Sequence, residues 1–191
     1  MTFFENYFMS AAIGVILIVG VGADVLGQRK FTISRSVMSF TSDAELELIQ
    51  ASTEKVQGLI DPTDNRFAFT VEVKTFEGFN SALQREHFND KYMESDKYPR
   101  ARFSGKIIEP IVFTTDGMYD VRAKGELDIH GQKQTRIIKA HVVIKNGVVE
   151  IDSQFFVPLA DHNISIPTIV SQKIASEIEI VFKATMSLQS L

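Results

Sequence analysis

The sequence predicts an all-β fold, an antiparallel eight-stranded barrel with one α-helix inserted around residues 81–93. Apolar and polar residues alternate along most of the chain, which is typical of strands with one buried and one solvent-facing side. Most of these segments are separated by short turns, so consecutive strands are expected to pair as antiparallel neighbours. One stretch alone has apolar residues at helical spacing. Seven or eight such strands favour closure into a barrel, because closure removes the unpaired edges.

The expected strands follow one another with little between them. Before the helix, the alternating segments cover residues 30–41, 44–52 and 53–61, and a turn of sequence DPTDN then leads into 66–76. After the helix, they cover 100–107, 119–129, 138–144, 149–157 and 178–184. Asn146-Gly147 is a strong hairpin signal between two of them, and residues 161–172 are expected to form an irregular connection.

The helix is expected to run from Ser81 to Met93. Asn80 or Ser81 can cap its first turn, and Leu83, Phe88 and Tyr92 form an apolar stripe. Pro99 then returns the chain to an extended conformation.

The inward-facing side chains of these strands define a candidate binding cavity. Large aromatic residues are mixed there with Gly58, Ala101, Gly105, Ala123, Gly125, Ala140 and Ala184, and small residues on several strands would leave open space. The same small residues could instead complement the large ones across a solid core, and periodicity does not decide between the two. The candidate lining is Phe67, Phe69, Val71, Phe103, Tyr119, Val121, Ala140, Phe155, Ile180 and Phe182, with Leu83, His87 and Phe88 at the mouth.

Composition argues against several functions. There is no cysteine, so disulfides and thiolate chemistry are excluded. Residues 1–27 hold two of the 24 acidic residues and no basic one, which leaves 20 basic against 22 acidic residues in the rest, a balance without a nucleic-acid footprint. No hydrolase elbow, phosphate-binding loop or zinc-ligand spacing occurs, so no catalytic residue, metal or cofactor is assigned.

The histidines and carboxylates favour structural roles. His130 and His141 have the outward parity of their strands and are expected on the surface. His87 could contact a ligand head group or simply join the helix to the barrel. Asp61 and Asp64 resemble part of a calcium loop, but a turn of this sequence needs no ion.

The N-terminus resembles a targeting segment. Residues 8–23 carry no charge, and the apolar run AAIGVILIVGVGA ends at Asp24, shorter than the ~20 residues of a membrane span. Residues 1–27 are therefore interpreted as a signal peptide, or alternatively an uncleaved anchor, although the first residues include Glu5 and no base. Residues 28–191 form the β-barrel domain, and the expected location is periplasmic or secreted.

The helical stretch also carries a resemblance to a known family. Leu83, Arg85-Glu86-His87-Phe88 and Tyr92, then Asp96-Lys97-Tyr98-Pro99 leading to Ala101 and Phe103, resemble the YceI-like family. The resemblance is strongest over 79–107 and weaker over 31–186. It implies a lipocalin-like barrel that holds a long isoprenoid or other lipid chain, and it favours an open cavity over a filled core.

Three functions follow from these observations. The first is an exported, non-catalytic carrier of a polyisoprenoid or fatty-acyl lipid. The second is an enzyme on the same barrel, which needs polar groups converging inside, where the predicted lining offers chiefly Ser153 and Tyr119. The third is a secreted stress or interaction module with a filled core. A homodimer, and membrane association through an uncleaved N-terminus, are compatible with the first.

Overall fold

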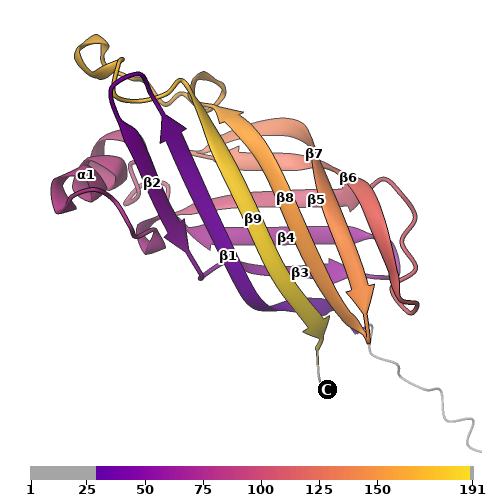
Figure 1. The fold of residues 1–191 in the computed structure, drawn as a ribbon. Helices are drawn as coiled ribbons and strands as arrows, with labels where there is room; N and C mark the ends of the chain where they lie inside the picture. Colours follow the sequence, from indigo (N-terminus) through magenta and orange to yellow (C-terminus); the bar gives the residue numbers. More distant parts are fainter. Residues whose placement is uncertain (1–28, 190–191) are drawn as a thin grey trace, which may run out of the picture.

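The computed structural model describes residues 29–189 and consists of one curved sheet with a small helical region at one end (Figure 1). Nine strands lie within these residues: β1 (Phe31–Asp43), β2 (Leu48–Thr53), β3 (Gln57–Asp61), β4 (Arg66–Glu72), β5 (Arg100–Ile107), β6 (Gly117–Ile129), β7 (Gln132–Lys145), β8 (Val148–Pro158) and β9 (Glu177–Leu188). Helix α1 (Ala82–His87) continues directly into a π-helical turn (Phe88–Tyr92), and 3-10 turns cover Val73–Thr75, Leu159–His162 and Thr168–Val170. The interpretation of residues 1–27 as a signal peptide lies outside the described residues.

The sheet closes into an antiparallel barrel, as predicted. Strands β3 to β9 pair in sequence order, and β9 pairs with β1 to complete the ring. The first part of β1 pairs with β3 and its second part, Met38–Asp43, pairs with β2. Strands β2 and β3 therefore lie end to end along the same edge of β1 and count as one strand position of the barrel. The nine described strands thus form a barrel that is eight strands around.

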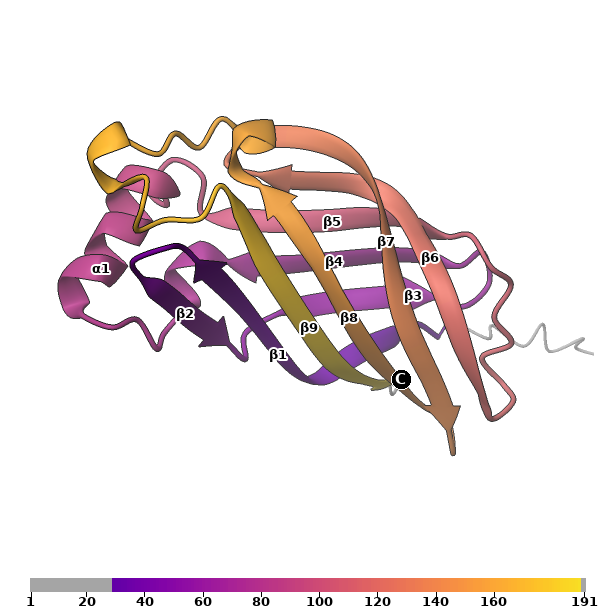
Figure 2. The same cartoon turned by 45° about the horizontal axis from the view of Figure 1, so that its top comes forward.

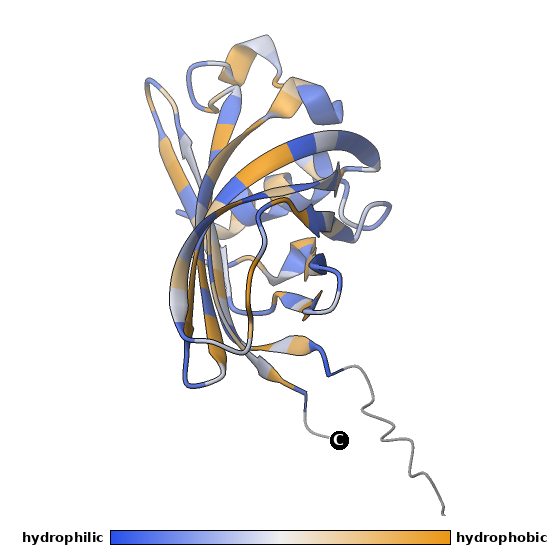
Figure 3. Ribbon diagram, turned by 90° about the vertical axis from the view of Figure 1, so that its right-hand side faces the viewer, coloured by the Kyte–Doolittle hydropathy of each residue, from blue (hydrophilic) through white to orange (hydrophobic). Residues whose placement is uncertain are grey.

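The alternation of side chains that predicted the strands is present in the structure. On β4, Phe67 and Val71 are buried whereas Arg66, Ala68 and Glu72 are exposed. Figure 3 shows the same alternation as hydrophobic and hydrophilic bands along the strands. The expectation that this strand continues to residue 76 is wrong. It ends at Glu72, and a 3-10 turn follows in which the amide of Phe76 donates to the carbonyl of Val73 (3.4 Å) and the hydroxyl of Thr75 donates to the carbonyl of Glu72 (2.7 Å).

The end of the barrel away from α1 is closed. The β5–β6 connection, residues 108–116, inserts Ile111 and Phe113, and the Phe113 ring packs on that of Phe31 with 5.3 Å between centroids. Both termini of the barrel lie at this end, because Phe31 pairs with Leu188 and the amide of Gln189 donates to the carbonyl of Lys30 (2.9 Å; Figure 1).

The ladder between β7 and β8 is incomplete. The two strands pair only between residues 141–145 and 148–152. Residues 132–140 of β7 then pair with β6 alone, and 153–158 of β8 with β9 alone. We call this stretch the seam. In Figure 2, β7 curves away from β8 there, and the 3-10 turn Leu159–His162 lies beside the opening.

Side chains bridge the seam in place of backbone hydrogen bonds. The hydroxyl of Ser153 donates to the carbonyl of Lys139 (2.7 Å), and the guanidinium of Arg136 donates to the carbonyl of Phe156 (2.8 Å). The strands are thus held together where their backbones no longer meet.

His130 and His162 join the same region to the helical segment. His130 is buried, with one ring nitrogen 3.0 Å from the carbonyl of His162 and the other 2.7 Å from a carboxylate oxygen of Glu94. The expected surface position of His130 is therefore wrong, because this residue lies in the β6–β7 turn with φ 53° instead of on a strand face. His141 does lie on the surface, beside Asp120 (2.9 Å).

Candidate functional site

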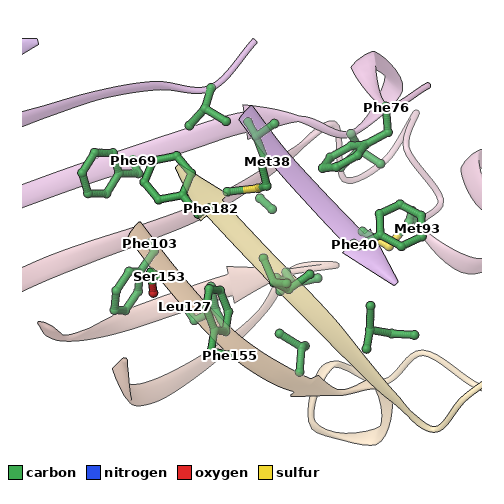
Figure 4. Close-up of a pocket in the computed structure, with 18 of the residues that line it drawn as sticks. Met38, Phe40, Phe69, Phe76, Met93, Phe103, Leu127, Ser153, Phe155 and Phe182 are labelled. Atoms are coloured by element: carbon green, nitrogen blue, oxygen red, sulfur yellow. The ribbon is translucent and has the colours of Figure 1, made fainter. Parts of the chain in front are cut away.

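The barrel encloses an apolar cavity of about 540 Å³ (Figure 4). The structure thus has an open interior and not the solid core that the sequence left as an alternative. The predicted lining residues that border the cavity are Phe67, Phe69, Val71, Phe103, Val121, Ala140, Phe155, Ile180 and Phe182, with Leu83, His87 and Phe88 at the mouth. Tyr119 is placed outside the lining. Its ring lies over Gly117 near the closed end and packs on the core there.

The small inward residues divide into two groups. Ala101, Ala123 and Ala140 border the cavity, as expected. The glycines do not. A Cβ on Gly105 would lie 2.1 Å from the carbonyl oxygen of Lys124, so this glycine allows close approach of β5 and β6 and opens no space in the lumen.

The hydroxyl groups of Ser42, Thr70 and Ser153, which border the cavity, already have hydrogen-bond partners. The hydroxyl of Ser153 donates across the seam, and that of Ser42 accepts from the amide of Ala175 (2.9 Å). The hydroxyl of Thr70 donates to the carbonyl of Ala101 (3.3 Å). The enzyme alternative needs the polar groups of Ser153 and Tyr119 to converge inside the barrel. They do not meet in the cavity, because Tyr119 lies outside its lining.

The helical insert forms one side of the mouth. The hydroxyl of Ser81 accepts the amide of Gln84 (3.1 Å), which confirms the predicted N-cap. The amide side chain of Gln84 donates to the carboxylate of Glu47 (2.9 Å), and that of Asn80 donates to the carbonyl of Leu48 (2.9 Å). These bonds fix α1 to the β1–β2 hairpin, so the helix lies over the barrel end, as predicted.

Aromatic packing anchors the helix to the barrel wall. Phe88 stacks on Phe40 with 5.2 Å between ring centroids and lies 5.1 Å from Phe79 and 6.2 Å from Phe76. Leu83, one turn earlier, borders the cavity but is 58% exposed, so its side chain lies at the opening.

The other side of the mouth is formed by residues 159–176, which we call the strap. The amide of Leu46 at the hairpin tip donates to the carbonyl of Gln172 (2.8 Å). Five strap residues border the cavity: Leu159, Ile164, Val170, Lys173 and Ile174. Sequence analysis missed them, because a segment without periodicity gives no sign of which side chains face inward.

Charged and polar lining groups cluster at the mouth. Asn80, Gln84 and His87 come from the helical insert, Glu47 from the hairpin and Lys173 from the strap. The side chains toward the closed end, among them Ile107, Ile111 and Phe113, are apolar. The lining of the cavity is therefore polar at the opening and apolar in the interior.

The described residues contain no cluster of three or more side chains suited to hold a metal ion. Asp61 accepts the hydroxyl and amide of Thr63, and these hydrogen bonds lower the pKa of the Asp61 carboxyl. Asp61 thus caps its own turn. Within residues 29–189, every helix is too short or too polar to cross a bilayer.

Comparisons with known proteins agree with this architecture. The family model for the YceI-like domain matches residues 27–186. No curated protein matches the sequence significantly. Among solved structures, BcnA from Burkholderia cenocepacia is 17% identical, with a TM-score of 0.66 over 78% of this chain and 95% of BcnA. A polyisoprenoid-binding domain from Saccharophagus degradans is 14% identical, with a TM-score of 0.68 over 83% of this chain and 98% of its own.

A third structure, the YceI protein of Campylobacter jejuni, is 12% identical, with a TM-score of 0.51 over 98% of this chain and 100% of that one. At these identities the three structures establish the fold. The family model covers most of the sequence, including the helical insert and every strand up to β9. The chain belongs to the YceI-like domain family.

Proposed function

We propose that this protein binds a lipid with one long apolar chain, of isoprenoid or fatty-acyl type, inside its barrel and carries it without chemical change. The observation that supports this most directly is the 540 Å³ cavity with an apolar lining, a volume within the range of small-molecule sites. Cavities lined by Leu, Ile and Phe side chains readily accept hydrocarbon.

The chain of the ligand supplies most of the affinity in this proposal. Each buried methylene contributes ~0.8 kcal/mol, so about ten methylenes contribute about 8 kcal/mol before the costs of association are counted. The costs of association offset about 4 kcal/mol or more of this gain, and each further buried methylene adds ~0.8 kcal/mol. Binding therefore needs no hydrogen bond deep in the barrel, where the described polar groups are already paired.

The lining also supports one orientation of the ligand. The polar residues His87 and Lys173 lie at the mouth, whereas Ile111 and Phe113 close the far end. A polar head group buried at the far end would lose its hydrogen bonds with water and find no partner. The ligand therefore places its tail toward Phe113 and its head near α1.

The solved relative from Saccharophagus degradans is described as a polyisoprenoid-binding domain, which favours this ligand class. The apolar N-terminal run supports export, and the proposed location is periplasmic or secreted. Cell fractionation tests the location. Recovery of the protein from the cytoplasm, with residues 1–27 still attached, would contradict export.

Native mass spectrometry of the purified protein tests the binding function. The expected result is a lipid adduct that is lost after organic extraction, with the extracted mass identifying the lipid. A second measurement uses fatty acids of increasing length on the extracted protein. Affinity should rise about fourfold per methylene until the cavity is filled. A protein that carries no lipid and binds no fatty acid would refute the proposal.

A further inference from the structure

Four phenylalanine rings form a continuous contact halfway along the cavity. The ring of Phe103 lies 4.9 Å from that of Phe67, which lies 5.7 Å from Phe69, which in turn lies 5.4 Å from Phe182. We call this set the aromatic collar. Three of its members, Phe69, Phe103 and Phe182, are near the middle of β4, β5 and β9 and are labelled in Figure 4. All four border the cavity.

The collar lies between the two ends of the cavity. On the mouth side lie Phe40, Phe88 and Leu83, and on the closed side lie Ile111 and Phe113. A ligand tail that fills the deep half must pass the collar. The width left by the four rings therefore limits which tails can reach the far end.

Gly58 on β3 supports one of these rings. It pairs directly with Phe69 of β4, and the Phe69 ring lies flat over the glycine backbone. A Cβ at residue 58 would lie 2.1 Å from Cδ1 and 2.7 Å from Cε1 of this ring, far inside van der Waals contact. Any larger residue at this position must displace the ring.

The direction of that displacement follows from the neighbours. The rings of Phe67 and Phe182 flank Phe69 at 5.7 and 5.4 Å, and the β3 backbone is beneath it. The remaining unfilled space is the cavity. A displaced Phe69 ring would therefore turn into the lumen and narrow the passage.

We propose that Gly58 is a specificity-determining position: by letting Phe69 fold back against β3, it keeps the collar wide enough for a hydrocarbon tail to enter the deep half. This inference rests on the proposed lipid-binding function. Gly58 does not border the cavity itself, so its role is to position Phe69.

The effect of Gly58 on affinity should depend on the chain length of the ligand, because only a long chain reaches past the collar. Phe69 is three residues from the mouth end of β4, which is roughly 10 Å of strand and about the length of an eight-carbon chain. Octanoate should therefore end near the collar, whereas palmitate must pass through it.

The test compares octanoate and palmitate binding to the delipidated wild type and Gly58→Ala by titration calorimetry. Octanoate affinity should stay within about twofold, and palmitate affinity should fall by about fourfold for each methylene kept out of the deep half. Gly147→Ala is the matched control. It removes a glycine with φ 75° from the β7–β8 turn, where nothing lies within 4 Å of a new Cβ, so the ratio of the two affinities should not change.

A second variant separates positioning from general damage. In Gly58→Ala/Phe69→Leu the flat ring is gone, so palmitate affinity should return toward that of Phe69→Leu alone. Phe69→Leu by itself also tests the collar if Gly58→Ala does not fold. It should improve binding of the methyl-branched alcohol farnesol relative to palmitate, because the passage is wider.

Several outcomes would overturn the inference. Equal losses for octanoate and palmitate in Gly58→Ala, no recovery in the double variant, or an unchanged farnesol preference in Phe69→Leu would each show that the collar does not control access. If the wild type itself binds neither fatty acid, the proposed function fails and this inference fails with it. Normal palmitate binding by Gly58→Ala would leave the function intact and refute only the role of Gly58.

Discussion

A larger side chain in the cavity wall should raise the unfolding free energy of the protein and lower its affinity for lipid. Ala140 on β7 faces the cavity opposite Val121 of β6 and is half-buried. In Ala140→Leu, three added carbons would occupy space that is empty in the free protein. At ~0.8 kcal/mol per buried carbon, this is about 2.4 kcal/mol of additional burial, reduced by about 0.5–1 kcal/mol of lost side-chain entropy.

The same three carbons exclude an equal volume of ligand. Losing about three methylenes of contact costs about 2.4 kcal/mol of binding free energy, or roughly a sixtyfold weaker Kd for palmitate. Urea denaturation of the lipid-free protein measures the first effect and titration calorimetry the second. The expected signature is an unfolding free energy higher by about 1.5–2 kcal/mol together with the weaker binding.

Ala68→Leu is the matched control, because Ala68 faces solvent on β4. It should change stability by no more than about 0.5 kcal/mol and leave Kd unchanged. If Ala140→Leu instead destabilises the protein by more than about 1 kcal/mol, the interior at this point is packed and the added carbons strain it. That result would refute the reasoning from an open cavity.

Three further predictions concern the frame around the cavity. The backbone N–H and guanidinium of Arg122 donate to the carboxylate of Glu109 and lower the pKa of that carboxyl group from 4.5. This interaction therefore stabilises the folded protein above pH 4.5, and the stabilisation is lost as pH falls through the lower folded-state pKa. Glu109→Gln should therefore be less stable than the wild type in denaturant at neutral pH, with the difference shrinking in acid. Gly131→Ala should destabilise by more than about 1 kcal/mol in the same assay, because Gly131 has φ 69° and a Cβ there would lie 2.5 Å from Cε1 of Tyr98. His130→Ala removes the ring beside the His162 carbonyl, so hydrogen exchange should accelerate in residues 159–164 and not in β4; unchanged exchange there would show that the ring does not hold this segment.

Most of the fold could be predicted because a barrel imposes a simple rule on its strands. Each residue faces either the lumen or solvent, so alternation alone identified the strands and the inward side of each one. Ser81 marked the start of the helical region and Pro99 the return to the extended strand β5, since capping and proline sterics are local effects. The continuation from α1 into a π-helical turn has no comparable signal in the sequence.

The misplaced residues depend on contacts between distant segments. His130 has the parity of an outward strand residue, but a left-handed turn directs it toward Glu94 and the strap. Gly105 has the parity of a lumen residue, yet its missing side chain lets two backbones approach. Neither geometry can be read from periodicity, because periodicity describes one strand at a time.

The candidate lining shows the same limit. Every predicted residue except Tyr119 borders the cavity, since parity alone places a side chain inside the barrel. The inward or outward parity of a residue does not tell how far along the barrel axis it lies. Tyr119 falls near the closed end beside Gly117, where the lumen is already filled.

The position of the two barrel termini determines how the protein can be attached to anything else. Phe31 and Leu188 are neighbours at the end that Phe113 closes, whereas α1 and Lys173 surround the opposite end. A tether joined at either terminus, whether a purification tag on a sensor chip or an anchoring peptide, therefore holds the barrel by its base. The opening then points outward from the support.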